Sequence, residues 1–304
     1  MAGINAELRD FLRAVRGRLR PSDVGLTPGR STAARRVTGL RREEVAQLAG
    51  LSVDYYARLE QGRTRQVGSA VIRALADALQ LSATERDYLF TLVNTQADSS
   101  RTTAAGPGPR RPQRARPGAR RLLEVLDNAP AFILGRGTAI LAMNDLARAL
   151  MFDADQRPVR ERNLALWTFL DPEARERYVD WDTVAPDTAA MLRVHAAEDP
   201  TDPEISAIVG ELSVKSDEFR RVWAAHHVFE CTHGRKRFNH PVVGRLDLDY
   251  EALDIPDSPG QALHIYTAPR GSRSEEGLQH LTRWTAPTLT PDDLPLARET
   301  RPEH

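Results

Sequence analysis

Residues 42–61 read REEVAQLAGLSVDYYARLEQ, and this stretch decides the fold of the N-terminal part of the chain. It predicts two short helices, over 42–49 and 52–61, that meet at a tight turn. Gly50 can take the left-handed conformation that ends the first helix, and the Ser52 hydroxyl can cap the second. Ala46 is small enough for close crossing, and six further residues are spaced to face a core: Val45, Leu48, Ala49, Leu51, Tyr56 and Leu59. The pattern predicts a helix-turn-helix.

Further helices are predicted on both sides of this motif, so that residues 1–95 form an all-α domain. An apolar stripe at helical spacing precedes the motif and ends before a proline; it comprises Leu8, Phe11, Leu12, Val15 and Leu19. After the motif, one helix is expected to begin with an N-cap at Ser69. The next is expected at Ser82, where Ser82 and Glu85 can form a capping box.

The formal net charge of zero hides a strong asymmetry along the chain. Residues 1–121 carry 22 arginines, no lysine and 11 acidic residues, a net charge of +11, and the remainder carries −11. A basic part joined to an acidic part indicates a polyanion-binding module attached to a module that does not bind polyanions. Together with the motif, the asymmetry predicts binding to double-stranded operator DNA.

The docking geometry of a helix-turn-helix assigns candidate base contacts to the start of the second helix. These candidates are Val53, Asp54, Tyr55 and Arg58. Arg58 can pair with guanine, Asp54 can accept from cytosine, and Val53 can touch a thymine methyl group. Alternatives stay open. Asp54 can interact favourably with the helix dipole, and Tyr55 can simply fill space. Arg58 can contact a phosphate or form an ion pair with Glu60 or Asp54.

Phosphate contacts form a second layer of candidates. They lie on or beside the two helices of the motif, in the loop that follows, at the next helix start, and in the Gly/Pro-rich loop at 21–39. The candidates are Arg41, Arg42, Gln47, Ser52, Arg63, Arg65, Ser69, Arg35 and Arg36. Ser52 is interpreted first as a cap and second as a phosphate ligand.

The chain changes character after residue 95. Residues 96–116 are rich in proline, glycine and arginine and predict a flexible basic linker. Residues 117–283 predict an α+β domain with a small antiparallel sheet, because strands at both ends flank a helical middle. Strands are expected at 131–134, 138–143, 241–243, 245–250 and 261–268, the first two as a hairpin, and residues 284–304 predict a loose tail.

Both parts of the chain resemble known regulators. Residues 5–94 resemble the helix-turn-helix of the Cro/cI/XRE superfamily. Short stretches distributed over 39–62 and about 118–282 are similar to the MmyB/MltR-type regulators: GLRREEVA (39–46), DYYARLEQG (54–62), NLA (163–165), FLDP (169–172), VGEL (209–212), PVVG (241–244) and LDY (248–250). The resemblance implies a sequence-specific transcriptional regulator whose C-terminal domain is PAS-like and binds a small lipophilic, fatty-acid-like ligand.

Three positions depart from these families: Tyr56 stands where many repressors have Ile or Val, Arg41 where a Ser or Thr cap is common, and Met143 where Trp usually precedes Asn144. For the ligand we expect an apolar pocket with a few polar groups. The candidates are Arg162, Asn163, Trp167, Trp223, Arg237, His240 and Tyr250. The aromatic members equally suit a core.

Other chemistry has weaker support in the sequence. Histidines 226, 227, 233 and 240 surround Cys231, and the spacing His-x3-Cys-x-His could hold zinc or activate the thiol. The second pair of ligands that zinc sites need is missing, so we expect no metal and no cofactor. Phosphate-loop, HExxH and GxSxG motifs are also missing, and we expect no enzyme.

We therefore expect a transcriptional regulator that pairs as a homodimer on half-sites about 10 base pairs apart and changes its DNA affinity with ligand. A single cysteine and the lack of any apolar run of about 18–20 residues predict a cytoplasmic protein without a membrane span. Two alternatives stay open: a second domain for protein interaction or dimerisation without ligand, and a small-molecule enzyme fused to a DNA-binding domain.

Overall fold

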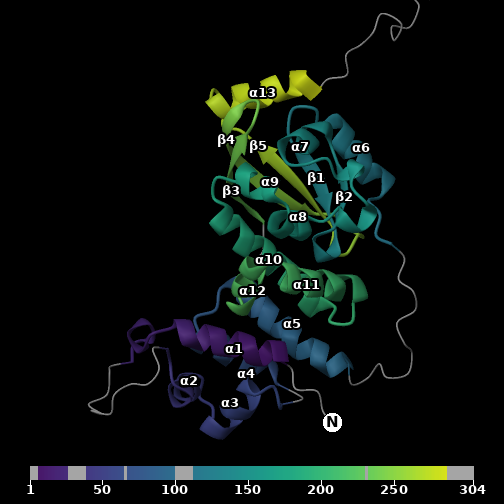
Figure 1. The fold of residues 1–304 in the computed structure, drawn as a ribbon. Helices are drawn as coiled ribbons and strands as arrows, with labels where there is room; N and C mark the ends of the chain where they lie inside the picture. The colour runs from purple at the N-terminus through teal and green to yellow at the C-terminus, as the bar shows by residue number, and fades with distance from the viewer. Residues whose placement is uncertain (1–5, 27–38, 65–66, 100–111, 230–231, 286–304) are drawn as a thin grey trace, which may run out of the picture.

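The structure is a computed structural model of the chain, and it describes residues 6–26, 39–64, 67–99, 112–229 and 232–285. A helical N-terminal domain and an α+β C-terminal domain pack against each other (Figure 1). Helices α10 (Trp181–Glu198), α11 (Pro203–Lys215) and α12 (Asp217–Ala224) lie between the sheet of the second domain and the helices of the first.

The N-terminal domain is all-α, as predicted. Its elements are α1 (Ala6–Arg18), the 3-10 turn η1 (Pro21–Val24), α2 (Arg42–Leu48), α3 (Val53–Glu60), α4 (Ser69–Ala78) and α5 (Ala83–Ser99). The stripe of α1 and the apolar positions of the motif meet in one core, which includes Leu8, Phe11, Leu12, Val15, Val45, Ala46, Tyr56 and Leu59. Burial of these side chains is the main force that stabilises the domain.

The turn of the motif has the predicted backbone. Gly50 has a φ of +65° with open space around it, so glycine is needed for conformation rather than for room. The Ser52 hydroxyl accepts a hydrogen bond from the Tyr55 amide at 3.2 Å and caps α3. The capping box of Ser82 and Glu85 is also present. One cap prediction was wrong: a neighbouring glycine is the N-cap of α4, and Ser69 is the first helical residue.

The C-terminal domain contains a five-stranded antiparallel sheet in the order β2-β1-β5-β4-β3. The strands are β1 (Ala131–Leu134), β2 (Ile140–Met143), β3 (His233–His240), β4 (Gly244–Asp254) and β5 (Ala262–Thr267). The other described elements are α6 (Pro117–Val125), η2 (Arg136–Thr138), α7 (Asp145–Leu150), η3 (Ala154–Gln156), η4 (Val159–Glu161), α8 (Leu164–Leu170), α9 (Pro172–Arg177) and α13 (Arg273–Thr285). The α+β fold and its small antiparallel sheet are confirmed.

Three details of this domain differ from expectation. The strand predicted at 241–243 is wrong: these residues form the turn between β3 and β4. β3 itself was missed because its sequence HGRKRFNH is polar, although Lys236, Phe238 and His240 alternate inward and are buried. α13 was missed as well, because only a short apolar side of this polar segment packs against the domain.

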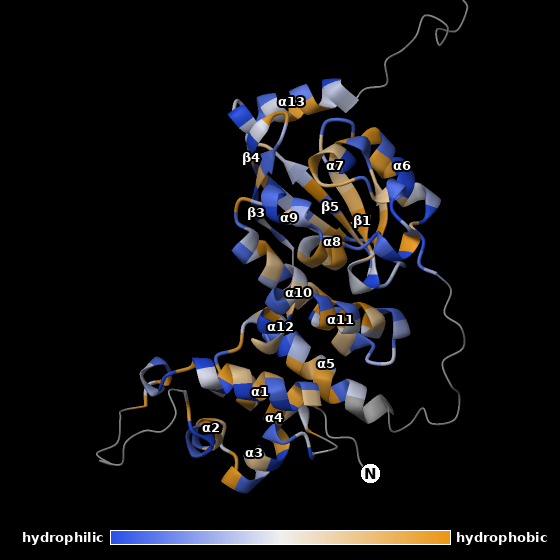
Figure 2. Ribbon diagram, viewed as in Figure 1, coloured by the Kyte–Doolittle hydropathy of each residue, from blue (hydrophilic) through white to orange (hydrophobic). Residues whose placement is uncertain are grey.

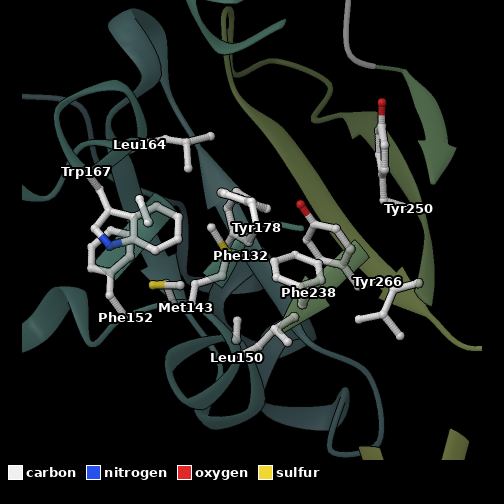
Figure 3. Packing of buried hydrophobic residues seen from close by; sticks show 14 of the residues in the cluster. Phe132, Met143, Leu150, Phe152, Leu164, Trp167, Tyr178, Phe238, Tyr250 and Tyr266 are labelled. Atoms are coloured by element: carbon white, nitrogen blue, oxygen red, sulfur yellow. The ribbon is translucent and has the colours of Figure 1, made fainter. Parts of the chain in front are cut away.

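Aromatic side chains fill the core of the C-terminal domain. Trp167 of α8 stacks on Phe152 with ring centres 4.7 Å apart and meets the edge of Tyr178 at 5.4 Å (Figure 3). Phe238 contacts Tyr178 at 5.0 Å from the sheet side. Hydrophobic residues run along β1 and β5 in the middle of the sheet (Figure 2). Such ring pairs add to the stability gained by burial alone.

Candidate nucleic-acid interface

The start of α3 forms an exposed face, whereas its other side is fixed in the core. Val53 is 44 % exposed, Asp54 and Arg58 are exposed, and Tyr55 is half-buried. The next inward residue, Tyr56, is fully buried. α3 lies at the end of the molecule farthest from the sheet (Figure 1). The four predicted base-contacting residues therefore lie on one accessible helix that the C-terminal domain does not cover.

A buried carboxylate fixes the other end of α3. Glu60 is fully buried and accepts hydrogen bonds from Arg16 of α1 (Nε, 2.8 Å) and Arg42 of α2 (Nε, 3.0 Å). Burial raises the pKa of Glu60, but the hydrogen bonds and charges of Arg16 and Arg42 outweigh burial and lower the pKa. From the sequence, Glu60 was expected only as a possible partner of Arg58. Its position four residues after Tyr56, on the inward side of the helix, was the available signal.

Arg58 does not form the ion pairs that were considered as an alternative to DNA contact. Among the described residues it pairs neither with Glu60 nor with Asp54, because Glu60 is engaged by Arg16 and Arg42. In the described part of the chain the exposed Arg58 guanidinium forms no ion pair, which leaves its N–H donors for another acceptor. Its contact with a base or a phosphate stays a prediction.

The predicted phosphate contacts fall into three groups. Four side chains are exposed beside α3: Gln47, Ser52, Arg63 and Ser69. Two of the predicted arginines have structural roles within the domain. Arg41 is the N-cap of α2, where its amide donates to Glu44 at 2.6 Å, and Arg42 holds Glu60. Arg35, Arg36 and Arg65 lie outside the described residues.

The seven residues predicted to bind a ligand do not converge on one site. Asn163 is buried and caps α8, because its side-chain oxygen accepts from two amides of the first turn. Arg162 pairs with Asp155 at 3.1 Å, and Arg237 forms an ion pair with Asp180. Each of these three polar groups therefore already has a structural partner.

The aromatic candidates are also dispersed. Trp167 lies in the main core, where its Nε1 has no hydrogen-bond partner within the described part of the chain. Tyr250 lies on the inner face of β4 near the Lys236 ammonium, 5.1 Å from its ring centre. Trp223 of α12 stacks on Phe219 at 5.1 Å and lies 4.0 Å from the guanidinium carbon of Arg193.

His240 is the candidate that lines a cleft. The cleft has a volume of about 360 Å³ and lies between the ends of α7, α9, β3 and α13. The His240 Nε2 lies 3.0 Å from the Ala149 carbonyl, and its Nδ1 accepts from the Val242 amide at 3.2 Å. Burial lowers the pKa of His240, so the ring is neutral near pH 7 and donates through Nε2. A second cleft of about 480 Å³ lies beside α6 and α7.

A charged cluster joins the two domains, and the sequence analysis missed it. Arg193 of α10 is 1 % exposed and forms an ion pair with Glu7 of α1. The Arg193 Nη1 lies 3.0 Å from the Nδ1 of His226, and the hydroxyl of Tyr88 in α5 donates to Glu7 at 2.8 Å. Burial raises the pKa of Glu7, but its partners His226, Arg193 and Tyr88 outweigh burial and lower the pKa to about 2.

The comparisons with known proteins match both domains. A helix-turn-helix domain model matches residues 7–89, and the model of the MmyB-like transcription regulator ligand binding domain matches residues 115–281, more than half of the chain. The chain belongs to the MmyB-like transcription regulators. The regulator therefore binds DNA through its N-terminal domain and takes a small-molecule ligand in its C-terminal domain. The search of curated proteins gave no match.

Within the described residues, no helix has the length and apolar character that a membrane crossing requires. The same residues hold no group of three or more histidine, cysteine, aspartate or glutamate side chains placed around a common metal position. Cys231, the centre of the histidine-rich stretch, lies outside the described residues.

Proposed function

We propose that the regulator recognises a specific operator sequence through α3, and that a small lipophilic ligand in the C-terminal domain changes its affinity for that operator. The observation that carries the proposal is the division of α3 into two sides. Tyr56 and Glu60 hold it in the core, and Val53, Asp54 and Arg58 extend outward. A helix fixed in this way presents its outer side chains in one geometry to base edges in the major groove.

Ligand control is supported by α10, which reaches from one domain to the other. Trp181 and Val184 near its start pack in the main core of the C-terminal domain, and Ala197 near its end packs in the core of the N-terminal domain. Between them, Arg193 pairs with Glu7 of α1. A ligand that shifts α10 would therefore act on α1, whose Arg16 holds the end of α3. The ligand must favour one position of α10 over another for this effect to occur.

The finer classification rests on the sequence resemblance. It supports an XRE-type motif, a PAS-like second domain and a fatty-acid-like ligand. We further propose a homodimer, because a single helix-turn-helix reads a short half-site, and a cytoplasmic regulator without catalytic activity of its own.

A fluorescence-anisotropy titration against the regulator's own upstream promoter tests the first half of the proposal. The titration is run at several salt concentrations, with scrambled DNA of equal length as competitor. Tight binding that resists the competitor and weakens steeply with salt is expected. Equal binding to promoter and scrambled DNA would contradict recognition of that promoter by α3.

The second half is tested by repeating the titration with delipidated protein and then with added palmitate. A change in promoter affinity on addition, with the affinity for scrambled DNA unchanged, is expected from a ligand that acts through α10. If delipidation and palmitate both leave the promoter affinity unchanged, control by a fatty-acid-like ligand is wrong, and the DNA-binding half of the proposal still stands.

A further inference from the structure

The cleft beside His240 has more basic than acidic side chains. Three arginines line it, Arg148, Arg157 and Arg177, against two acids, Asp153 and Glu173. His240 adds no charge near pH 7, because burial lowers its pKa. A volume of about 360 Å³ is within the range of small-molecule sites. The cleft therefore has the size for a small molecule. Asp145, Asp155 and Asp171 pair with two of its arginines, so selection for an anion depends on the arginine donors that remain unused.

Two of these arginines retain hydrogen-bond donors. Arg157 makes a single side-chain hydrogen bond in the described part of the structure, from Nη2 to Asp171 at 2.5 Å. Arg177 is 8 % exposed and bonds Glu173 through Nη2, while its buried Nη1 has no partner among the described residues. A guanidinium has five N–H donors, and a buried donor without an acceptor costs free energy. An acceptor that enters the cleft and displaces the atoms covering Nη1 would relieve that cost.

Arg148 differs from these two. It bonds Asp145 at 2.6 Å and Asp155 at 2.6 Å and 3.1 Å, so most of its donors are used. Unused donors are thus concentrated on Arg157 and Arg177. Planar guanidinium groups bind carboxylates and phosphates with paired hydrogen bonds. The chemistry of the cleft selects for an anionic oxygen group.

Aromatic rings form the apolar wall of the same cleft. Phe152 lies under the Arg157 guanidinium, 4.8 Å from its carbon to the ring centre. The same ring stacks on Trp167 (Figure 3). Trp284 of α13 lines the cleft and is 63 % exposed. A molecule with a ring or a short apolar body can lie against Phe152 and Trp284 while its charged group meets the arginines.

Hydrogen bonds and an ion pair connect the walls of the cleft. His240 binds the last turn of α7 through Ala149 and the β3–β4 turn through Val242. Glu173 and Arg177 lie one turn apart on α9 and pair with each other. Because these contacts are present without a ligand, fewer groups must be ordered on binding.

We infer that this cleft is an anion-binding site, in which Arg157 and Arg177 hold the carboxylate or phosphate group of a small molecule whose apolar part packs on Phe152 and Trp284. The inference rests on the proposed ligand-binding role of the C-terminal domain, and it specifies the chemistry of the ligand's head group. It also links the site to the core, because Phe152 stacks directly on Trp167.

The test is isothermal titration calorimetry of the full chain with three probes that share a ring body. Naphthoate and naphthyl phosphate carry the two anionic groups, and naphthalenemethanol is neutral. Binding of at least one anion at millimolar concentration or below is expected, with the neutral probe about 10-fold or more weaker. The stronger anion identifies the head group. Failure of both anions to bind, or equal binding of the neutral probe, would overturn the inference.

Variants locate the site. Arg157→Gln and Arg177→Gln should each weaken binding of the preferred anion by about 10-fold or more. Arg160→Gln, an exposed arginine outside the cleft that pairs with Glu211, should leave it unchanged. Circular dichroism checks folding, and if Arg177→Gln unfolds, the more exposed Arg157→Gln carries the test. Equal losses of anion affinity in Arg157→Gln and Arg160→Gln would show that the anion does not bind at this cleft. No DNA is present, so the result is separate from operator recognition.

Discussion

Glu60 is the residue on which the orientation of α3 depends most. It is buried without contact to solvent and is held by Arg16 and Arg42. Glu60→Ala should lower the free energy of unfolding by about 3 kcal/mol, because two guanidinium groups lose the carboxylate that they surround. Urea unfolding followed by circular dichroism measures the loss. Glu43→Ala, an exposed residue of α2, is the control and should stay within about 0.5 kcal/mol of the parent.

Arg58 and Arg63 separate base contacts from phosphate contacts. Both are exposed, Arg58 on α3 and Arg63 in the loop after it. Arg58→Ala should cost about 1–3 kcal/mol of operator affinity and relax the preference at one base pair, whereas Arg63→Ala should weaken all sequences alike. Anisotropy titrations against the operator and its single-base variants measure both effects. A uniform loss in both variants would show that Arg58 contacts the backbone.

At the scale of elements, the tight turn between α2 and α3 depends on one conformation. Gly50 has a φ of +65° with nothing nearby, and Gly17, in the last turn of α1, likewise has open space around it. Gly50→Ala should destabilise the chain by about 1–2 kcal/mol because a side chain strains the left-handed backbone. Gly17→Ala should stabilise it by up to about 1 kcal/mol because alanine favours a helix.

Thermal and urea unfolding of the two glycine variants give opposite signs if backbone conformation is the cause. A Gly50→Ala variant as stable as the parent would mean that Gly50 is kept for another reason, such as close approach of the DNA backbone. α3 would then need the glycine for binding rather than for folding.

At the scale of the whole molecule, one acid responds to pH at the boundary between the two domains. The pKa of Glu7 is about 2, below its ordinary value of 4.5, because His226, Arg193 and Tyr88 outweigh the effect of burial. An acid with a lowered pKa in the folded state contributes stability above its unfolded pKa and loses it as pH falls through the folded pKa. The contribution of Glu7 is therefore complete above about pH 4.5 and disappears towards pH 2.

Glu7→Gln should remove this part of the pH dependence. The free energy of unfolding, measured from pH 6 down to the acid limit of the fold, should fall less steeply in the variant below about pH 4.5. It should also be lower than the parent value at neutral pH, since Arg193 then remains buried without a carboxylate partner. Coincident curves for parent and variant would show that the Glu7–Arg193 pair does not contribute to the joint stability of the domains.

The sequence by itself determined the elements whose signals are local. Gly50, Ser52 and the apolar spacing from Val45 to Leu59 identify the helix-turn-helix, because turn conformation, capping and helical periodicity depend on neighbouring residues. The strand at 131–134 was predicted with its observed limits for the same reason. The charge difference between the two halves predicted the division into a DNA-binding part and a second part.

Only the tertiary structure decided what distant residues do together. The sequence of β3 is largely polar, and its inward-facing residues can be recognised only from their burial in the folded domain. The seven predicted ligand residues turned out to lie apart, while Arg157 and Arg177 came together with His240 at one cleft. Glu60 with Arg16 and Glu7 with Arg193 are pairs that no local pattern connects. Ion pairs and clefts arise from segments far apart along the chain, and their position is set by the packing of whole elements.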